Sequence, residues 1–101
     1  MLDQAKLMKQ AFDMKRKMDK TQKELSKREL VVQYGSATIT ITGDQQIREV
    51  KLDPTVQEME NIRELEATIK NAFNKAISES QEAAKKELQA ITGGLNIPGL
   101  T

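Results

Sequence analysis

The sequence predicts an α+β fold in which two long helices accompany a three-stranded antiparallel sheet. Two long segments, 3–28 and 61–90, contain no Gly or Pro and repeat their apolar residues at helical spacing. Between them, residues 30–53 contain short β-prone runs separated by turn residues. With 101 residues, of which 38% are hydrophobic and 31% charged, we expect one small domain (1–101) that needs a second copy to complete its core.

Residues 1–29 are predicted to form a helical arm, with the helix running from about Asp3 to Arg28. An apolar stripe along one face is expected to pack in the core or in a dimer, through Leu7, Met14, Met18 and Leu25. An advance of about 100° per residue places a cationic stripe on the opposite face, formed by Lys9, Arg16, Lys20, Lys23 and Lys27. Phe12 falls between the two faces, where it can pack at a dimer interface or touch a DNA groove, and packing is the favoured interpretation.

Residues 30–53 are predicted to form the antiparallel meander. The first strand is the run from Leu30 to Tyr34, and Gly35-Ser36 suits a two-residue turn. Residues 37–42 alternate threonine with apolar residues, as expected for a strand with one buried face. The third strand is expected at 47–52, with Val50 and Leu52 facing inward.

The second long helix is expected over residues 61–90, with Asn61 as its N-cap. Apolar residues recur at spacings of three and four in its first half and suit a helix that covers the sheet; they are Ile62, Leu65, Ile69, Ala72, Phe73, Ala76 and Ile77. Phe73 is interpreted as a core residue. Gly93 is expected to stop the helix, and residues 91–101 are expected to form a mobile, glycine-rich tail.

The absence of Cys and His removes several classes of chemistry. Thiolate nucleophiles, disulfides, imidazole catalysis and zinc sites built on these ligands all need one of those side chains. Four carboxylates crowd the expected start of the second helix, where the helix dipole favours negative charge without any metal; they are Glu58, Glu60, Glu64 and Glu66. We therefore expect no enzyme activity, catalytic residue, metal, cofactor or small-molecule substrate.

The longest apolar run has only three residues, Leu30 to Val32, so we expect neither a membrane span nor a secretory signal, and a cytoplasmic location. The formal net charge of +1 hides an uneven distribution. Residues 1–30 carry nine basic and five acidic groups, whereas the remaining residues are slightly acidic. The chain is therefore predicted to present a basic arm, and nearby phosphates respond to that local potential.

Three strings of the sequence carry a resemblance to a known family. They are Lys51-Leu52-Asp53-Pro54-Thr55, Ala72-Phe73-Asn74-Lys75-Ala76, and the terminal run from Leu88 to Gly99. Together with the order of elements, they resemble the YbaB/EbfC family of bacterial nucleoid-associated proteins over essentially the whole chain. The resemblance implies a tweezer-like homodimer that binds double-stranded DNA in the nucleoid with little sequence preference, and effects on chromosome organisation and gene expression.

The resemblance implies a DNA-binding surface on the helices but no fixed contact residues, so the contacts are predicted from charge. The prediction consists of the five residues of the cationic stripe together with Lys85 and Lys86 near the end of the second helix. A merely solvated helix face is the alternative interpretation of the stripe, and the resemblance favours DNA binding. The alternative function is a protein-interaction module, such as a small chaperone or adaptor that uses its amphipathic helices.

Overall fold

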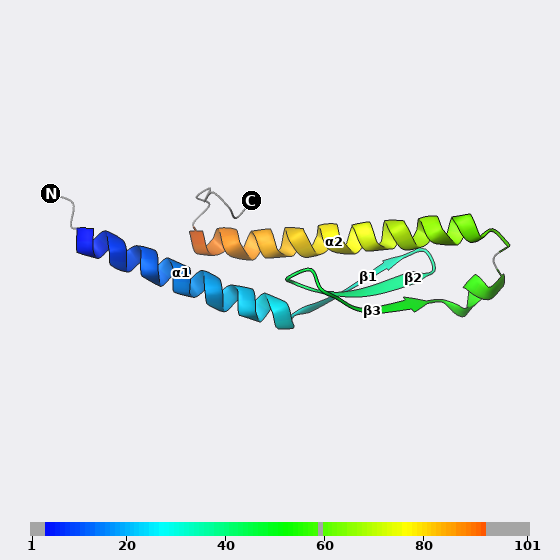
Figure 1. The fold of residues 1–101 in the computed structure, drawn as a ribbon, viewed down its shortest axis with the longest axis horizontal. Coiled ribbons are helices and arrows are strands. Elements are labelled where there is room, and N and C mark those ends of the chain that lie inside the picture. The colour runs from blue at the N-terminus through cyan, green and yellow to red at the C-terminus, as the bar shows by residue number, and fades with distance from the viewer. Residues whose placement is uncertain (1–3, 59, 93–101) are drawn as a thin grey trace.

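The element order is helix, three strands and helix, as the sequence predicts (Figure 1). The computed structural model describes residues 4–58 and 60–92. The elements are α1 (Gln4–Lys27), β1 (Glu29–Tyr34), β2 (Ala37–Thr42), β3 (Ile47–Leu52), the short 3₁₀ helix η1 (Pro54–Glu58) and α2 (Ile62–Thr92). The predicted α+β class and the antiparallel meander are therefore confirmed.

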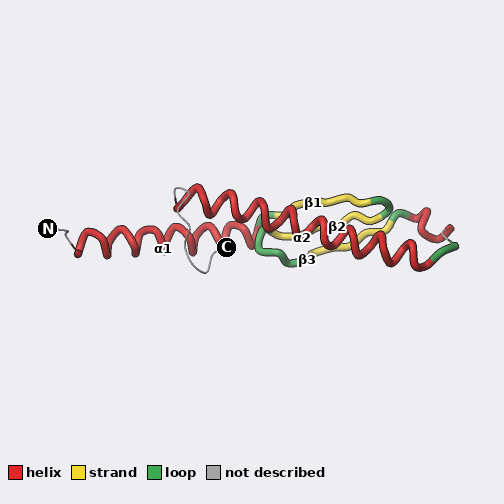
Figure 2. Tube along the Cα trace, turned by 90° about the horizontal axis from the view of Figure 1, so that it is seen from above, coloured by secondary structure: helices red, strands yellow, loops and turns green. Residues whose placement is uncertain are grey.

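The molecule is long and thin, with extents of 72 × 21 × 15 Å. Helix α2 runs along one face of the sheet, and its last turns lie beside the second half of α1 (Figures 1 and 2). The first half of α1 projects past the end of α2 as an arm. The radius of gyration is 19.2 Å, whereas a compact chain of this length is expected to have about 13 Å, and the projecting arm accounts for much of the difference.

The sheet has the order β1-β2-β3, with both neighbouring pairs antiparallel. Gly35 has a φ of 55°, the left-handed conformation needed in the tight turn between β1 and β2. Ile39 of β2 lies opposite Val32 of β1 and Val50 of β3, so these three side chains share one face. Arg48 is an extra residue in β3 relative to β2 and forms a bulge.

The buried core lies between α2 and the first two strands. Among the described residues it consists of Val32, Ala37, Ile39, Ile41, Ala72 and Ala76, with Leu30 and Phe73 packed against it. The alanines of α2 let the helix axis approach the sheet closely, because they add little side chain between the two backbones. Phe73 is half-buried and packs against the edge of this core.

Polar contacts on its two flanks fix the position of α2 over the sheet. On one flank, the Lys75 Nζ donates to the Gln33 carbonyl of β1 at 3.0 Å. On the other flank, the Gln81 side-chain amide donates to the Gln45 side chain in the β2–β3 turn at 3.3 Å. Between the flanks, the buried Ser80 hydroxyl donates to the Thr42 carbonyl at 2.7 Å. Helix α2 therefore lies over β1 and β2 and leaves β3 beyond its edge.

This offset changes the predicted burial of β3. Val50 and Leu52 share the face that α2 covers on β2, as predicted, but they are 42% and 39% exposed. Ile62 and Ile77 of α2 are also exposed, at 69% and 36%, although their spacing predicted that they would cover the sheet. The reason is geometric, because the helix is narrower than three strands and cannot cover all of them.

The ends of the elements differ slightly from the prediction. The Asn61 side-chain oxygen accepts from the Arg63 amide at 3.0 Å, which confirms Asn61 as the N-cap of α2. Helix α2 continues to Thr92, two residues further than predicted, because the first residue that disfavours the helix is Gly93. Strand β1 begins at Glu29, one residue earlier than predicted. Residues 93–101 of the expected tail lie outside the described residues.

The loop after β3 is held by its own side chains. The Asp53 carboxylate accepts from the Thr55 amide at 2.9 Å. Hydrogen bonds from the Thr55 amide and hydroxyl hold the pKa of Asp53 below its ordinary value of 3.8. The Asp53 amide also donates to the Ser36 carbonyl at 2.8 Å, which ties the end of β3 to the β1–β2 turn.

Gly43 forms the junction between α1 and the sheet. Its amide donates to the Leu25 and Arg28 carbonyls, each at 2.9 Å. A Cβ at this position would lie 2.8 Å from both the Leu25 carbonyl oxygen and the Leu25 Cδ2. Leu25 itself is only 3% exposed, so neither it nor the backbone has room to move.

We expect Gly43→Ala to lower the free energy of unfolding by about 1–3 kcal/mol, because the added methyl overpacks this junction. Urea unfolding followed by circular dichroism measures the change. Ser78→Ala, on the exposed side of α2, is the matched control and is expected to stay within about 0.5 kcal/mol of the native chain. Equal stability of the Gly43 variant and the control would contradict the close approach.

Candidate nucleic-acid interface

The cationic stripe of α1 lies on the side of the helix that faces away from α2. Helix α1 packs through the other side, where Leu25 is buried and Met14 and Met18 are half-buried. Residues of the stripe are about half a turn away from that side, and all five are exposed. The structure therefore leaves Lys9, Arg16, Lys20, Lys23 and Lys27 together on an open helix face.

The apolar stripe of α1 is only partly covered within one protomer. Leu25 is a core residue, and Met14 and Met18 are half-buried. Leu7 is 48% exposed and is not a core residue of the protomer, because this part of α1 lies beyond the end of α2 (Figure 1). Packing of Leu7 against a second copy stays a prediction.

Lys85 and Lys86 lie on a different side of the molecule. Helix α2 faces α1 through Ala84, Leu88 and Ile91, which are half-buried, whereas both lysines are exposed. Their helical positions place them on the outer side of α2. Within one protomer, the two groups of cations therefore point away from each other and do not form one continuous surface.

Acidic residues border the cationic face of α1 on both sides. Asp13 lies one turn from both Lys9 and Arg16, and the exposed Asp19 lies near Lys20 and Lys23. Nearby, Arg28 forms an ion pair with Glu87 that joins the end of α1 to α2. Arg28 is therefore engaged within the protomer. The five cations of the stripe have Asp13 and Asp19 beside them, which lower the positive potential of this face.

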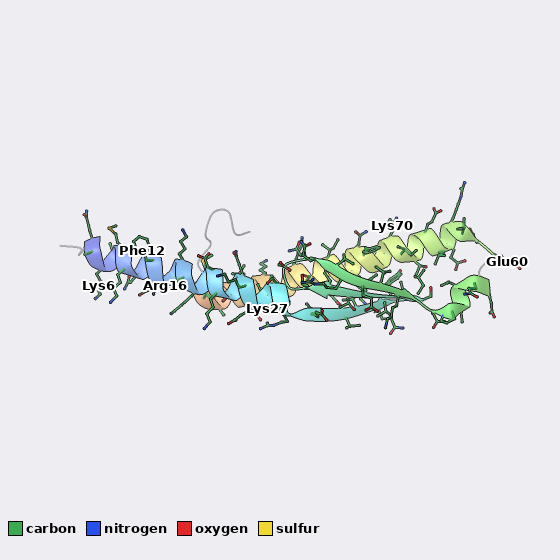
Figure 3. All side chains as sticks on the ribbon, turned by 60° about the horizontal axis from the view of Figure 1, so that its bottom comes forward. Lys6, Phe12, Arg16, Lys27, Glu60 and Lys70 are labelled. Carbon is green, nitrogen blue, oxygen red and sulfur yellow. The ribbon has the colours of Figure 1, made fainter. Side chains whose placement is uncertain are left out.

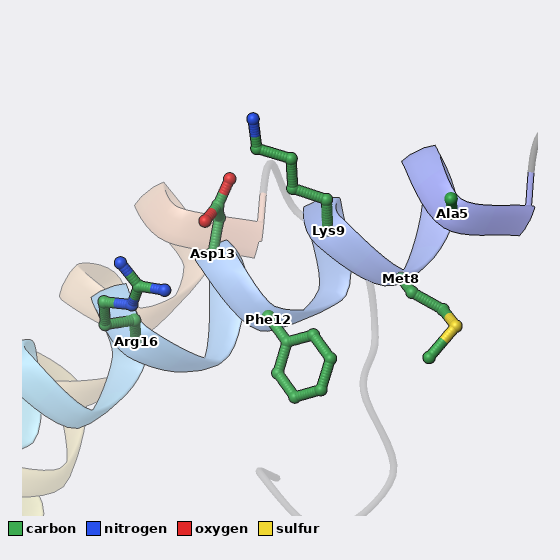
Figure 4. A pocket seen from close by; sticks show the side chains of 6 residues that line it. All are labelled: Ala5, Met8, Lys9, Phe12, Asp13 and Arg16. Atoms are coloured by element: carbon green, nitrogen blue, oxygen red, sulfur yellow. The ribbon is translucent and has the colours of Figure 1, made fainter.

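Two apolar side chains lie beside the cations on the projecting part of α1. Phe12 is 61% exposed and Met8 is 59% exposed. They project to one side of the helix, whereas Lys9 and Asp13 project to the other side (Figure 4). Arg16 lies one turn further along the helix than Phe12. A shallow groove of about 540 Å³ is lined by Ala5, Met8, Lys9, Phe12, Asp13 and Arg16. Packing of Phe12 at a dimer interface stays a prediction, and within the protomer no other described element lies beside it (Figure 3).

Helical geometry supplied a signal for this exposure. At about 100° per residue, Met8 and Phe12 lie about 100° and 140° from the centre of the apolar stripe, too far around the helix to face the same neighbour. The number of apolar residues in the helix does not predict that Met8 and Phe12 are exposed, whereas their angular positions around the helix axis do.

Comparison with known proteins decides the family of this chain. The model of the YbaB/EbfC DNA-binding family matches residues 1–95. The chain belongs to this family. Membership of the YbaB/EbfC family confirms the resemblance carried by the three strings of the sequence, and it supports DNA as a partner of the chain.

Relatives of the YbaB/EbfC chain include two clostridial proteins that are described as nucleoid-associated. The protein of Clostridium acetobutylicum is 34% identical over 96 residues, which cover 93% of this chain and 86% of the relative. The protein of Ruminiclostridium cellulolyticum is 36% identical over 97 residues, which cover 93% of this chain and 84% of the relative.

A solved structure shares the fold of this YbaB/EbfC chain. The crystal structure of an uncharacterised protein from Helicobacter pylori matches with a TM-score of 0.80 over 92% of this chain and all of that chain. The sequence identity is 14%, so the likeness concerns the fold. None of the helices in the described part of the chain is both long and apolar enough to cross a membrane.

Proposed function

We propose that this protein is a nucleoid-associated protein that binds duplex DNA through phosphate contacts with little or no sequence specificity. The observation that carries the proposal is the open cationic face of α1, on an arm that projects beyond the rest of the fold. Family membership supplies the class of ligand. In the cell, such binding would place the protein in the cytoplasm at the nucleoid, where it would affect chromosome organisation and gene expression.

The proposed mechanism is electrostatic docking. Lys and Arg side chains that approach phosphates release condensed counterions, and this gain is independent of base sequence. Base readout by hydrogen bonds needs side chains aimed at the edges of the bases, and the α1 face offers cations and carboxylates rather than paired amide groups. Affinity is therefore expected to depend steeply on salt and weakly on sequence.

We also propose that the functional unit is a homodimer. The buried core of one protomer is small, and three of its six members are alanines. Beside it, an apolar strip between α2 and β3 is open to solvent, formed by Ile47, Val50 and Leu52 of β3 with Phe73 and Ile77 of α2. Phe73, Ile77 and Gln81 share one side of α2, and the contact of Gln81 with Gln45 places that side toward β3. A second copy is the partner that we propose covers this α2–β3 strip.

A two-fold dimer would present two cationic arms from one central body. If all five cations of the stripe on each arm engaged phosphates, the slope of log K against log salt would be about −9. Fewer engaged residues give a shallower slope, so the measured slope counts the phosphates that are contacted. The tweezer-like outline expected for the family is one arrangement of two such arms.

The experiment that tests this proposal is a salt titration of binding to a fluorescent random duplex, with light scattering to determine the mass. We expect a dimer whose affinity falls at least about a hundredfold between 50 and 200 mM salt, and falls equally for duplexes of different sequence. Absence of binding at 50 mM salt would overturn the DNA proposal. Salt-insensitive capture of a protein partner in its place would favour the adaptor function.

A further inference from the structure

We propose that Phe12, with Met8 beside it, is a wedge that inserts between base pairs from the minor groove of the bound duplex. The inference rests on the proposed DNA-binding function of α1 and adds a contact to the bases. It predicts that the protein prefers DNA whose base pairs are easily unstacked. No phosphate contact alone produces such a preference.

The first argument is the exposure of an apolar pair at this place. Phe12 and Met8 are about 60% exposed on a helix that has no other described element beside them (Figure 3). Burial of an aromatic ring contributes hydrophobic stabilisation, and the exposed Phe12 ring does not make this contribution within the protomer. Because α2 ends before it reaches this part of α1, none of the described elements of the protomer covers these side chains, and we infer that a bound partner does.

The second argument is the charge around the pair, which selects the partner. Phe12 lies one turn from Lys9 and one turn from Arg16, and those two cations are separated by about 10 Å along the helix. Both cations line the same shallow groove as the two apolar side chains (Figure 4). The two cations favour a partner with negative charge on each side of an apolar contact, and DNA offers a phosphate strand on each side of an apolar base stack.

The third argument is the chemistry of such contacts. Proteins that insert Phe, Leu or Met between base steps surround the inserted side chain with cations, and phosphate contacts offset the cost of unstacking. The stripe supplies these cations at Lys9, Arg16, Lys20 and Lys23. Asp13 lies within the same face and limits the approach on its own side, so the ring is expected to enter from the side on which Met8 and Phe12 project (Figure 4).

The test compares a fully paired 20-base-pair duplex with one that has a single central mismatch, using fluorescence anisotropy. A mismatch lowers the cost of unstacking at one step, so the native protein is expected to bind the mismatched duplex about tenfold more tightly. Phe12→Ala is expected to remove this preference and to weaken binding to the paired duplex about tenfold, with the salt slope unchanged. Phe12→Leu, which keeps an apolar wedge, is expected to retain most of the preference.

Gln10→Ala is the matched control, because Gln10 is an exposed residue on the same part of α1 that lies outside both the cationic and the apolar stripe. It is expected to leave the mismatch preference unchanged. A 2-aminopurine placed beside the mismatch reports unstacking directly, and its fluorescence should rise with the native protein and not with Phe12→Ala.

Three results would overturn the wedge. In the first, Phe12→Ala and the native protein show the same mismatch preference. In the second, the native protein binds both duplexes equally with a steep salt slope, which leaves the proposed phosphate docking intact and removes only the wedge. In the third, Phe12→Ala halves the mass in light scattering, which assigns Phe12 to a contact between copies. Loss of all binding by the native protein would instead refute the proposed function.

Discussion

Reversal of three stripe cations, Lys9, Arg16 and Lys20, to Glu is expected to weaken binding to random duplex DNA at least about a hundredfold at 100 mM salt. In the proposed dimer the change removes six cations and adds six carboxylates. If all six cations contact phosphates, the slope of log K against log salt becomes less steep by about 5. The three side chains are exposed, so the fold and the dimer are expected to survive. Anisotropy titrations, with light scattering beside them, measure both quantities.

The matched control is reversal of Lys6, Lys15 and Lys17 to Glu, which changes the net charge by the same amount on the same helix. These lysines are also exposed, but they lie outside the stripe. The control is expected to lose much less affinity than the stripe variant, because screening confines phosphate contacts to short range. Equal losses for the two variants would show that overall charge, and not this face of α1, governs binding.

Replacing Val50 with Asp is expected to dissociate the proposed dimer. Val50 lies in the middle of the α2–β3 strip and is 42% exposed in the protomer, so a carboxylate there stays hydrated in the monomer. Burial of one valine contributes about 1.5 kcal/mol, and a two-fold interface contains the residue twice. The dimer is therefore expected to weaken by about 3 kcal/mol or more, which is about a hundredfold in the dissociation constant. Sedimentation equilibrium measures this constant.

Val31→Asp is the control for the Val50 variant. Val31 is 70% exposed on the opposite face of the sheet, so the same chemical change is made outside the proposed interface. It is expected to leave the mass unchanged. A monomeric Val31 variant beside a dimeric Val50 variant would place the interface on the other face. Circular dichroism melting of both variants separates dissociation from unfolding of the protomer.

The effect of the Val50 variant on DNA binding separates the two parts of the proposal. A monomer has one cationic arm, so it is expected to contact half as many phosphates, and its salt slope is expected to be about half that of the dimer. Affinity should fall steeply, because two linked arms bind far more tightly than one. A monomeric variant with unchanged affinity and slope would show that one arm alone carries the binding.

Local patterns in the sequence were sufficient to predict the secondary structure. The two long helices, the turn at Gly35 and the N-cap at Asn61 depend on backbone propensity and on hydrogen bonds between near neighbours, and all of them are found in the structure. The family also followed from local strings. The open cationic face of α1 could be predicted for the same reason, because the angular position of a residue on a helix depends only on its number.

Burial depended on which element lies beside which, and only the tertiary structure decided it. The spacing of Val50, Leu52 and Ile77 predicts an apolar face, but their exposure follows from the offset of α2 toward β1, which Lys75 and Gln81 hold through contacts distant in sequence. The place where α2 ends beside α1 likewise decides that no other helix or strand of the described chain covers Phe12 and Leu7. The sequence by itself determined the elements, their faces and the family, because these depend on neighbours along the chain. The tertiary structure decided which faces stay open, because coverage depends on lengths and offsets between elements that no local pattern encodes.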